Sequence, residues 1–238
     1  MNGVDLDNFD FVPHGDVTIS YAWNTKATEF EYGNRQYNRT RIHAKKSYGF
    51  RVGGSESMLD RLMEFFDSHH GKADPFLFTY DGVTEKCYFA DTMVVNLHRE
   101  NAKIVGGECD IVLEVDKQVT NYPKPSTDDI LPLSRGDINY TLDWRTDVYT
   151  TSSTQRRVRY AIPTKKMEIT ITGGKSTRDK LIELFNSHEM MPLKMVVGGK
   201  TYDVRFPSDL EITDKREGSN IIGFESKLEV QICNPTNS

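Results

Sequence analysis

The sequence predicts a mainly β (α+β) protein made of two tandem duplicated domains, each with one amphipathic helix. A repeat is the first observation behind this prediction: Gly15-Asp16-Val17 followed by Trp23 returns as Gly136-Asp137-Ile138 followed by Trp144. The spacing of about 120 residues is the length of a domain, whereas solenoid repeats are spaced about 20–50 residues apart. Each copy is therefore expected to close a core of its own.

A second block of the repeat carries the helices. Residues 57–69 return as residues 176–188, and both blocks end in Ser-His. Apolar residues at spacings of three and four, from Leu59 to Phe66, form a single stripe and predict a helix over 58–68. A shorter stripe, from Leu181 to Phe185, predicts a helix over 177–187. The Ser-x-x-Asp spacing that begins at Ser57 and at Ser176 predicts a capping box at each N-terminus.

Strands are predicted on both sides of each helix, which is the third observation. Before the helix, Tyr48 to Val52 and Met167 to Ile171 alternate apolar and polar residues up to a glycine pair. After it, the turns Asp81-Gly82 and Gly198-Gly199 predict hairpins. A last alternating strand ends each copy, and its Leu-Glu-Val triplets, 113–115 and 228–230, suggest how the two copies align.

The repeat and a proline-rich stretch set the domain boundaries. Pro123, Pro125 and Pro132 predict a stiff linker at 119–134. The domains are then residues 1–118 and 135–238.

Composition restricts the classes of protein. The chain has 238 residues, 27% of them charged, and a net charge of −5. No apolar run reaches the ~20 residues that span a bilayer, so no membrane partner is expected. The acidic N-terminus does not resemble a signal peptide, and the three cysteines are not repeated, so we expect reduced thiols in a protein made in a cytoplasm. An acidic chain of this kind is not expected to hold nucleic acid, although DNA could pass it.

No motif for catalysis, a cofactor or a metal is present, so a non-enzymatic protein is expected. The Gly-Gly-x-Ser stretch before each helix lacks the spacing of a phosphate-binding loop and is interpreted as a strand-to-helix turn. His69 and His188 occupy equivalent positions, but they lack the companion ligands of a zinc site. They are expected to interact with the last carbonyls of the helices.

Charged residues supply the candidate functional positions. Glu114 and Glu229 lie opposite the apolar face of a strand, where they would face solvent or the lumen of a ring. Basic segments at 35–46 and 156–166 are common to both copies and suggest either nucleic-acid binding or an intersubunit surface that pairs with acidic strands. The candidate intersubunit residues are Arg35, Arg39, Arg41, Arg156, Arg157 and Arg159.

The order of elements resembles the N-terminal module of distal tail proteins of long-tailed bacteriophages and gene transfer agents. The resemblance rests on Phe65-Phe66, Gly71 to Phe76, Tyr80-Asp81-Gly82 and Tyr88 in the first copy. In the second copy it rests on Leu184-Phe185, Pro192-Leu193, Gly198-Gly199-Lys200 and Tyr202. It covers most of both copies as a pattern of residue types. Family members often join this module to a different C-terminal domain, whereas here a second copy fills that place.

The resemblance implies a tail-tube-like β-barrel or sandwich in each copy. It also implies a virion protein, assembled in the host cytoplasm, that forms a ring at the distal end of the tail tube. Such a ring would contact the tail tube protein and the tail hub or tip proteins and let DNA pass without specific binding. A hexamer is favoured, and a trimer is the alternative because two modules per chain also occur in trimeric hubs. A carbohydrate- or receptor-binding module, with Tyr21, Trp23, Tyr140 and Trp144 stacking on sugars, is the alternative from another class.

Overall fold

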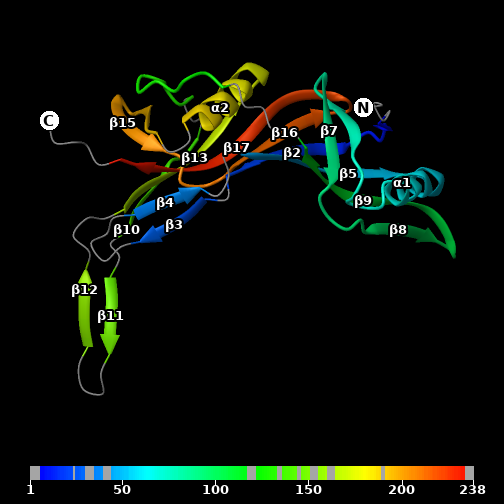
Figure 1. Cartoon of the computed structure of the whole chain (residues 1–238), viewed down its shortest axis with the longest axis horizontal. Coiled ribbons are helices and arrows are strands. Elements are labelled where there is room, and N and C mark those ends of the chain that lie inside the picture. The colour runs from blue at the N-terminus through cyan, green and yellow to red at the C-terminus, as the bar shows by residue number, and fades with distance from the viewer. Residues whose placement is uncertain are drawn as a thin grey trace, which may run out of the picture. The chain divides into compact units, whose positions relative to one another are not determined.

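The computed structural model describes residues 6–23, 25–29, 35–39, 44–116, 122–132, 136–143, 146–150, 155–159, 164–188 and 191–233. Most of these residues lie in strands, and two helices, α1 (Glu56–Ser68) and α2 (Lys175–His188), complete the described secondary structure (Figure 1). The prediction of a mainly β fold with one helix in each half is confirmed. Thirteen of the described strands belong to one large open sheet.

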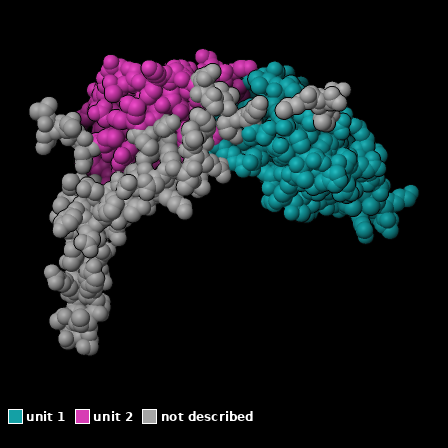
Figure 2. Space-filling model, in the orientation of Figure 1, with its two compact units in different colours: residues 1–22, 45–120, 211–225 teal, residues 23–44, 121–210, 226–238 magenta. Residues whose placement is uncertain are grey.

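The chain forms two compact units that are interleaved along the sequence (Figure 2). Unit 1 contains residues 1–22, 45–120 and 211–225, and unit 2 contains residues 23–44, 121–210 and 226–238. This division differs from the predicted boundaries at 118 and 135, because each half of the sequence contributes one segment to the unit that is formed mainly by the other half.

Unit 1 is a sheet with α1 packed on β5 and β9. Its strands run in the order β1-β6-β7-β9-β5-β2-β16-β17, and β8 also pairs with β9. They are β1 (Asn8–Phe9), β2 (His14–Ala22), β5 (Lys45–Gly54), β6 (Phe76–Tyr80), β7 (Val83–Phe89), β8 (Val95–Glu100), β9 (Lys103–Val115), β16 (Leu210–Glu217) and the first part of β17 (Asn220–Ile232).

Unit 2 contains the second part of β17, with β13 and β10 following on one side and β15 and β14 on the other. Its strands include β10 (Asn139–Asp143), β13 (Thr164–Gly173), β14 (Leu193–Val197) and β15 (Lys200–Arg205). Two hairpins form separate two-stranded sheets: β3 (Thr25–Glu29) with β4 (Arg35–Arg39), and β11 (Thr146–Thr150) with β12 (Gln155–Arg159).

The core of unit 1 is aromatic. Leu59 and Leu62 of α1 are fully buried, as the apolar stripe predicts, and Phe65 adds an aromatic side chain beside them. The rings in contact are those of Phe9, Phe11, Phe50, Phe65, Phe76, Phe78 and Phe89. Phe66, predicted to be buried, is only half-buried and contacts the ring of Phe89.

The core of unit 2 has fewer aromatic residues. Leu181, Leu184 and Phe185 of α2 are buried, and the ring of Phe185 lies between those of Trp23 and Phe206. Phe66 with Phe89 and Phe185 with Phe206 are corresponding pairs, but among the described residues only Phe185 has a tryptophan as a third ring. Trp144 lies outside the described residues.

The predicted capping boxes are wrong. Helix α1 begins at Glu56, so Ser57 lies inside its first turn, and the N-cap residue is Ser55, whose side chain makes no capping hydrogen bond. Helix α2 begins at Lys175, and the carboxylate of Asp179 accepts a hydrogen bond from its neighbour Arg178. Ser55 separates the glycine pair from α1, and α2 follows its glycine pair directly. Each helix therefore begins one residue before the serine that was predicted to cap it.

The same strand register occurs in both halves. In the β2–β5 pair Thr18 lies opposite Gly49 and Ala22 opposite Lys45. In the β10–β13 pair Asn139 lies opposite Glu168 and Asp143 opposite Thr164. These pairs correspond residue by residue, so Ile19 and Tyr21 of β2 are equivalent to Tyr140 and Leu142 of β10.

Strands β8 and β16 are among the strands that were not predicted from the sequence. Each is the first strand of a hairpin, β8–β9 and β16–β17, with two residues in its turn. Both hairpins shift register at the same place, between His98 and Arg99 and between Lys215 and Arg216. The first turn was missed because Asn101 and Ala102 adopt positive φ values of 46° and 66° without a glycine.

Candidate functional site

The two candidate lumen residues, Glu114 and Glu229, lie on the exposed face of their strands, opposite the buried residues, as predicted. Each is ion-paired to a lysine of the neighbouring strand. Glu114 pairs with Lys45 of β5, and the carboxylate of Glu229 lies 2.7 Å from Nζ of Lys166 on β13. Each of these two glutamates is therefore balanced by a lysine.

The alignment of β9 with β17 through the Leu-Glu-Val triplets is wrong by two residues. Cys87 lies opposite Val115 in the β7–β9 pair, and Val204 lies opposite Ile232 in the β15–β17 pair. Val115 therefore corresponds to Ile232, and Glu114 corresponds to Gln231 instead of Glu229. The two glutamates share a face but not a position. The triplet match arose because any alternating strand of this composition offers similar short strings.

Further ion pairs extend the charged face in unit 1. The guanidinium of Arg51 on β5 lies 2.9 Å from the carboxylate of Asp110 and 3.2 Å from that of Glu108, both on β9. These carboxylates raise the pKa of the Arg51 guanidinium. Because the side chains are largely exposed, we expect each pair to add little to stability and to act as surface charge.

The corresponding face of unit 2 has a shallow depression of about 480 Å³. It is lined by Asp137, Asn139, Glu168, Ile169, Thr170, Lys227, Leu228 and Glu229. Among the described residues, Asp137 makes no hydrogen bond or ion pair.

In unit 1 the residue equivalent to Asp137 is Asp16, and it receives a cluster of donors from the β16–β17 hairpin. Its carboxylate lies 3.0 Å from Nζ of Lys215 and accepts a hydrogen bond from the backbone amide of Arg216. The hydrogen bond from Lys215 lowers the pKa of the Asp16 carboxyl below its usual range. The guanidinium of Arg216 also donates to the carbonyl oxygen of Pro13.

A buried contact completes the docking of this hairpin. The hydroxyl of Tyr80 donates a hydrogen bond of 2.8 Å to the carboxylate of Asp214, which is fully buried. Sequence reasoning did not select Asp16, Asp214 or Tyr80 as functional residues. The available signal was the repeated Gly-Asp pair: Gly15 and Gly136 have φ values of 83° and 127°, which favour glycine and set the direction of the aspartate that follows.

The candidate intersubunit arginines lie on the small hairpins, and the structure describes only their backbone. Arg35 lies opposite Glu29, and Arg39 lies opposite Thr25, in the β3–β4 pair. In the β11–β12 pair, Arg156, Arg157 and Arg159 lie opposite Tyr149, Val148 and Thr146. Arg41 falls outside the described residues. The described arginines thus belong to hairpins that form separate sheets. The ends of the basic segments lie instead on β5 and β13 of the large sheet, where Lys45 and Lys166 pair with the two glutamates. The role of the arginines between subunits stays a prediction.

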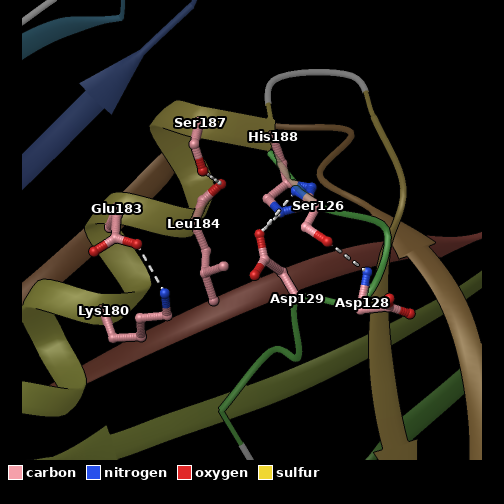
Figure 3. Close-up of polar contacts among 8 residues, drawn as sticks. All are labelled: Ser126, Asp128, Asp129, Lys180, Glu183, Leu184, Ser187 and His188. Atoms are coloured by element: carbon pink, nitrogen blue, oxygen red, sulfur yellow. Dashed lines mark hydrogen bonds and ion pairs between the residues drawn. The ribbon is translucent and has the colours of Figure 1, made fainter. Parts of the chain in front are cut away.

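The two helix-terminal histidines make different contacts, and only His69 makes the one that was predicted. His69 Nδ1 lies 2.7 Å from the carbonyl oxygen of Phe65, the kind of contact predicted for a helix C-terminus. His188 is fully buried, and its Nε2 donates to the carboxylate of Asp129 at 2.9 Å (Figure 3). No group of three potential metal ligands occurs among the described residues.

Asp129 ties the proline-rich segment to unit 2. Its backbone carbonyl accepts from the amide of Lys194, and the amide of Leu131 donates to the carbonyl of Lys194, both at 2.8 Å. Leu131 is fully buried. The described part of the predicted linker, 122–132, contains a turn at Thr127-Asp128 and packs against α2 and β14.

Two of the four aromatics proposed for sugar stacking are not accessible. Tyr21 and Trp23 are buried, Tyr140 is exposed, and Trp144 is not described. A buried ring cannot offer its face to a sugar, so this group does not form a sugar-binding platform in the part of the chain that is described.

The comparisons with protein families and with curated proteins find no match for this chain. Neither described helix has the length and apolar character needed to cross a bilayer.

Proposed function

We propose that the protein is a structural component of a phage-like tail, and that it assembles into a ring at the distal end of the tail tube. In this proposal the two halves are tandem copies of a tail-tube-like module, with strands ordered as in a barrel or sandwich wall. The ring connects the tube to the tip or baseplate proteins and lets DNA pass. It needs no catalytic group or cofactor.

One observation carries this proposal: the two halves repeat the same strand register while leaving strand edges open. The β2–β5 and β10–β13 pairs correspond residue by residue, and so do the bulged β8–β9 and β16–β17 hairpins. A repeated module with open strand edges is suited to closed, symmetric assembly, because ring closure pairs edges that would otherwise invite aggregation.

The charged strand faces are suited to a DNA passage. Lysines balance Glu114 and Glu229, and Arg51 is balanced by Glu108 and Asp110. A face of paired charges offers phosphates no cluster of free cations to bind. Its local field is also screened within about 8 Å at physiological ionic strength.

Light scattering combined with negative-stain electron microscopy tests the proposal. We expect the purified protein to form a discrete oligomer with a central opening. Charge reversal at Arg39 and Arg41 should weaken that oligomer and leave the monomer folded. The matched control is charge reversal at Lys124, an exposed residue outside both small hairpins.

The outcome that would contradict a ring is a monomer at all concentrations. If the monomer also binds glycans on an array, the carbohydrate- or receptor-binding module replaces this proposal.

A further inference from the structure

Strands β8 and β10 of the large sheet each have an open edge in the described part of the chain. Strand β8 pairs only with β9, and strand β10 pairs only with β13. Both strands carry exposed apolar side chains: Leu97 on β8, and Tyr140 and Leu142 on β10. Exposed apolar strand edges are uncommon unless another chain covers them.

The repeat identifies what each edge is built to pair with. Strand β8 is equivalent to β16, since their hairpins share the same turn length and the same bulge. Strand β10 is equivalent to β2, since both pair in the same register with their neighbours. Within unit 1, β16 is hydrogen-bonded to β2. The chain therefore makes this edge contact once, between β16 and β2 (the closed contact). The equivalent strands, β8 and β10, are both present but are not paired with each other.

An acid and a cation of the closed contact recur at the open edges, with the cation moved by one position. Asp16 accepts from the side chain of Lys215 and from the backbone amide of Arg216, and the equivalents of these two residues are His98 and Arg99 of β8. The equivalent of Asp16 is Asp137, which lines the depression in unit 2. Among the described residues, neither Arg99 nor Asp137 has a polar partner, and both are exposed.

The two residues that form the buried hydrogen bond of the closed contact are both replaced at the open edges. In unit 1 the Tyr80 hydroxyl bonds to Asp214. By the hairpin registers, Asp214 is equivalent to Leu97 and Tyr80 to Val197. A hydrogen-bonded pair is thus replaced at both positions by apolar residues, which removes the cost of leaving one polar group without its partner.

The exposed fractions of equivalent side chains on β2 and β10 differ in the way expected if the edge of β10 is uncovered. Ile19 and Tyr21 of β2 are 4% and 6% exposed, whereas Tyr140 and Leu142, their equivalents on β10, are 49% and 46% exposed. The same apolar stripe is covered in one unit and uncovered in the other.

We propose that strand β8 of one chain pairs with strand β10 of a second copy, placing Arg99 against Asp137 and Leu97 near Val197 of that copy. The contact is head-to-tail, because the two edges differ, so successive contacts generate a ring or an open filament. It repeats between chains the contact that β16 and β2 make within one chain. This inference rests on the proposed ring and names the surface that closes it.

Charge reversal tests the pairing, with sedimentation velocity as the readout. Arg99→Glu places like charges at the contact, and so does Asp137→Arg, and we expect each to weaken self-association at least about tenfold. The double variant Arg99→Glu/Asp137→Arg should restore the oligomer. Lys124→Glu, at an exposed position of the segment 122–132, is the control for a charge change elsewhere, and circular dichroism confirms that each variant is folded.

Mixing the two single variants is the decisive arm. The Arg99→Glu chain retains a normal β10 edge, and the Asp137→Arg chain retains a normal β8 edge. We expect the mixture to restore an oligomer in which the two variants alternate, because every contact between unlike variants joins opposite charges, whereas every contact between like variants joins like charges.

Failure of this inference differs from failure of the ring. If the wild type forms rings that neither single variant disturbs, the edge pairing is wrong and the ring stands. If mixing the two variants restores assembly but the wild type forms open filaments, the edge pairing stands and the ring is wrong. A wild type that stays monomeric, together with no assembly on mixing, overturns both.

Discussion

Single side chains at the end of α2 fix the proline-rich segment in place. The carboxylate of Asp129 accepts hydrogen bonds from the buried imidazole of His188 and from the backbone amide of Ser126. These two hydrogen bonds, led by that of Ser126, lower the pKa of Asp129. Composition alone marks this segment as a spacer. It is nevertheless part of unit 2, because the carboxylate of Asp129 accepts one hydrogen bond from within the segment and one from α2.

Removal of this acid should destabilise unit 2. Asp129→Ala leaves the His188 donor buried without a partner, so we expect a loss of about 1–3 kcal/mol in the free energy of unfolding, measured in urea. Asp128→Ala is the matched control, since it removes only an exposed ion pair with Lys194 and should change stability by less than about 0.5 kcal/mol. Equal effects of the two substitutions would show that the His188 contact is not structural.

The three free cysteines should differ in reactivity. Burial raises the pKa of Cys87 to about 12 and that of Cys109 to about 11, and both side chains are buried. Only the thiolate reacts readily, so at pH 8 we expect Ellman's reagent to modify Cys233, which is half-buried, well before the other two. Cys233→Ser should then abolish the fast phase. A fast phase that persists in this variant would contradict the burial of Cys87 and Cys109.

At the scale of elements, the helices show what a repeat conserves and what it changes. Leu62 and Leu181 are buried at corresponding positions, but the position of the buried Leu59 is taken by Arg178 in α2. Phe185 is enclosed by Trp23 and Phe206, whereas Phe66 contacts Phe89 and stays half-buried. The two faces look alike in sequence because the difference comes from Trp23, which is distant along the chain.

Alanine substitution should reveal this difference. Phe185→Ala removes a fully buried ring, and we expect a loss of about 3–5 kcal/mol in the free energy of unfolding. Phe66→Ala should cost clearly less, because the ring is already partly in contact with water. Thermal or urea unfolding of the two variants, followed side by side, checks the order, and a larger loss for Phe66→Ala would reverse our assignment of the enclosed position.

Docking of the β16–β17 hairpin should depend on acid pH through Asp16. The lowered pKa means that the ionised carboxylate stabilises the fold above the unfolded value of about 3.9, and this contribution is lost as pH falls through the folded value. Asp16→Asn should therefore reduce stability at pH 6 but match the wild type near pH 2.5, measured by urea unfolding. A difference that persists unchanged in acid would assign the effect to packing.

Local patterns predicted the strands and helices, whereas long-range pairing escaped them. The hairpins at Asp81-Gly82 and Gly198-Gly199 have the residues that such turns require, and the structure confirms both. Strand β8 leads into a turn without glycine and carries mostly exposed residues, so it has no periodic pattern to detect. The Gly-Asp pairs were visible as a repeat, but their meaning requires the partner of Asp16, some 200 residues away.

At the scale of the whole chain, the interleaving of the two units is the feature that sequence repeats cannot give. A sequence repeat indicates which segments are alike. It does not indicate which copy of a strand pairs with which neighbour, because equivalent strand edges have similar sequences. Segment 211–225 belongs to unit 1 because β16 pairs with β2, a choice made by tertiary contacts. The same logic leaves β8 and β10 available to a second chain.

The assignment of the charged strand face to a DNA passage predicts a position-dependent response to added positive charge. In the double variant Glu114→Lys/Glu229→Lys, both ion pairs with lysines are replaced by like charges, so each strand gains cations without carboxylate partners. If this face lines the opening of the ring, duplex DNA should bind the assembled variant with an affinity that falls steeply as salt rises, since phosphate contacts release counterions. The wild type should show little binding.

The control for that variant is Glu56→Lys/Glu64→Lys, which gives the same net charge but changes α1, at exposed positions outside the strand face. Fluorescence anisotropy with a labelled duplex, at two salt concentrations, separates place from total charge. Binding by the strand-face variant alone supports a lumen at Glu114 and Glu229. Equal binding by both variants would attribute the effect to net charge and remove these glutamates from the passage, because attraction by total charge does not depend on which face carries the lysines.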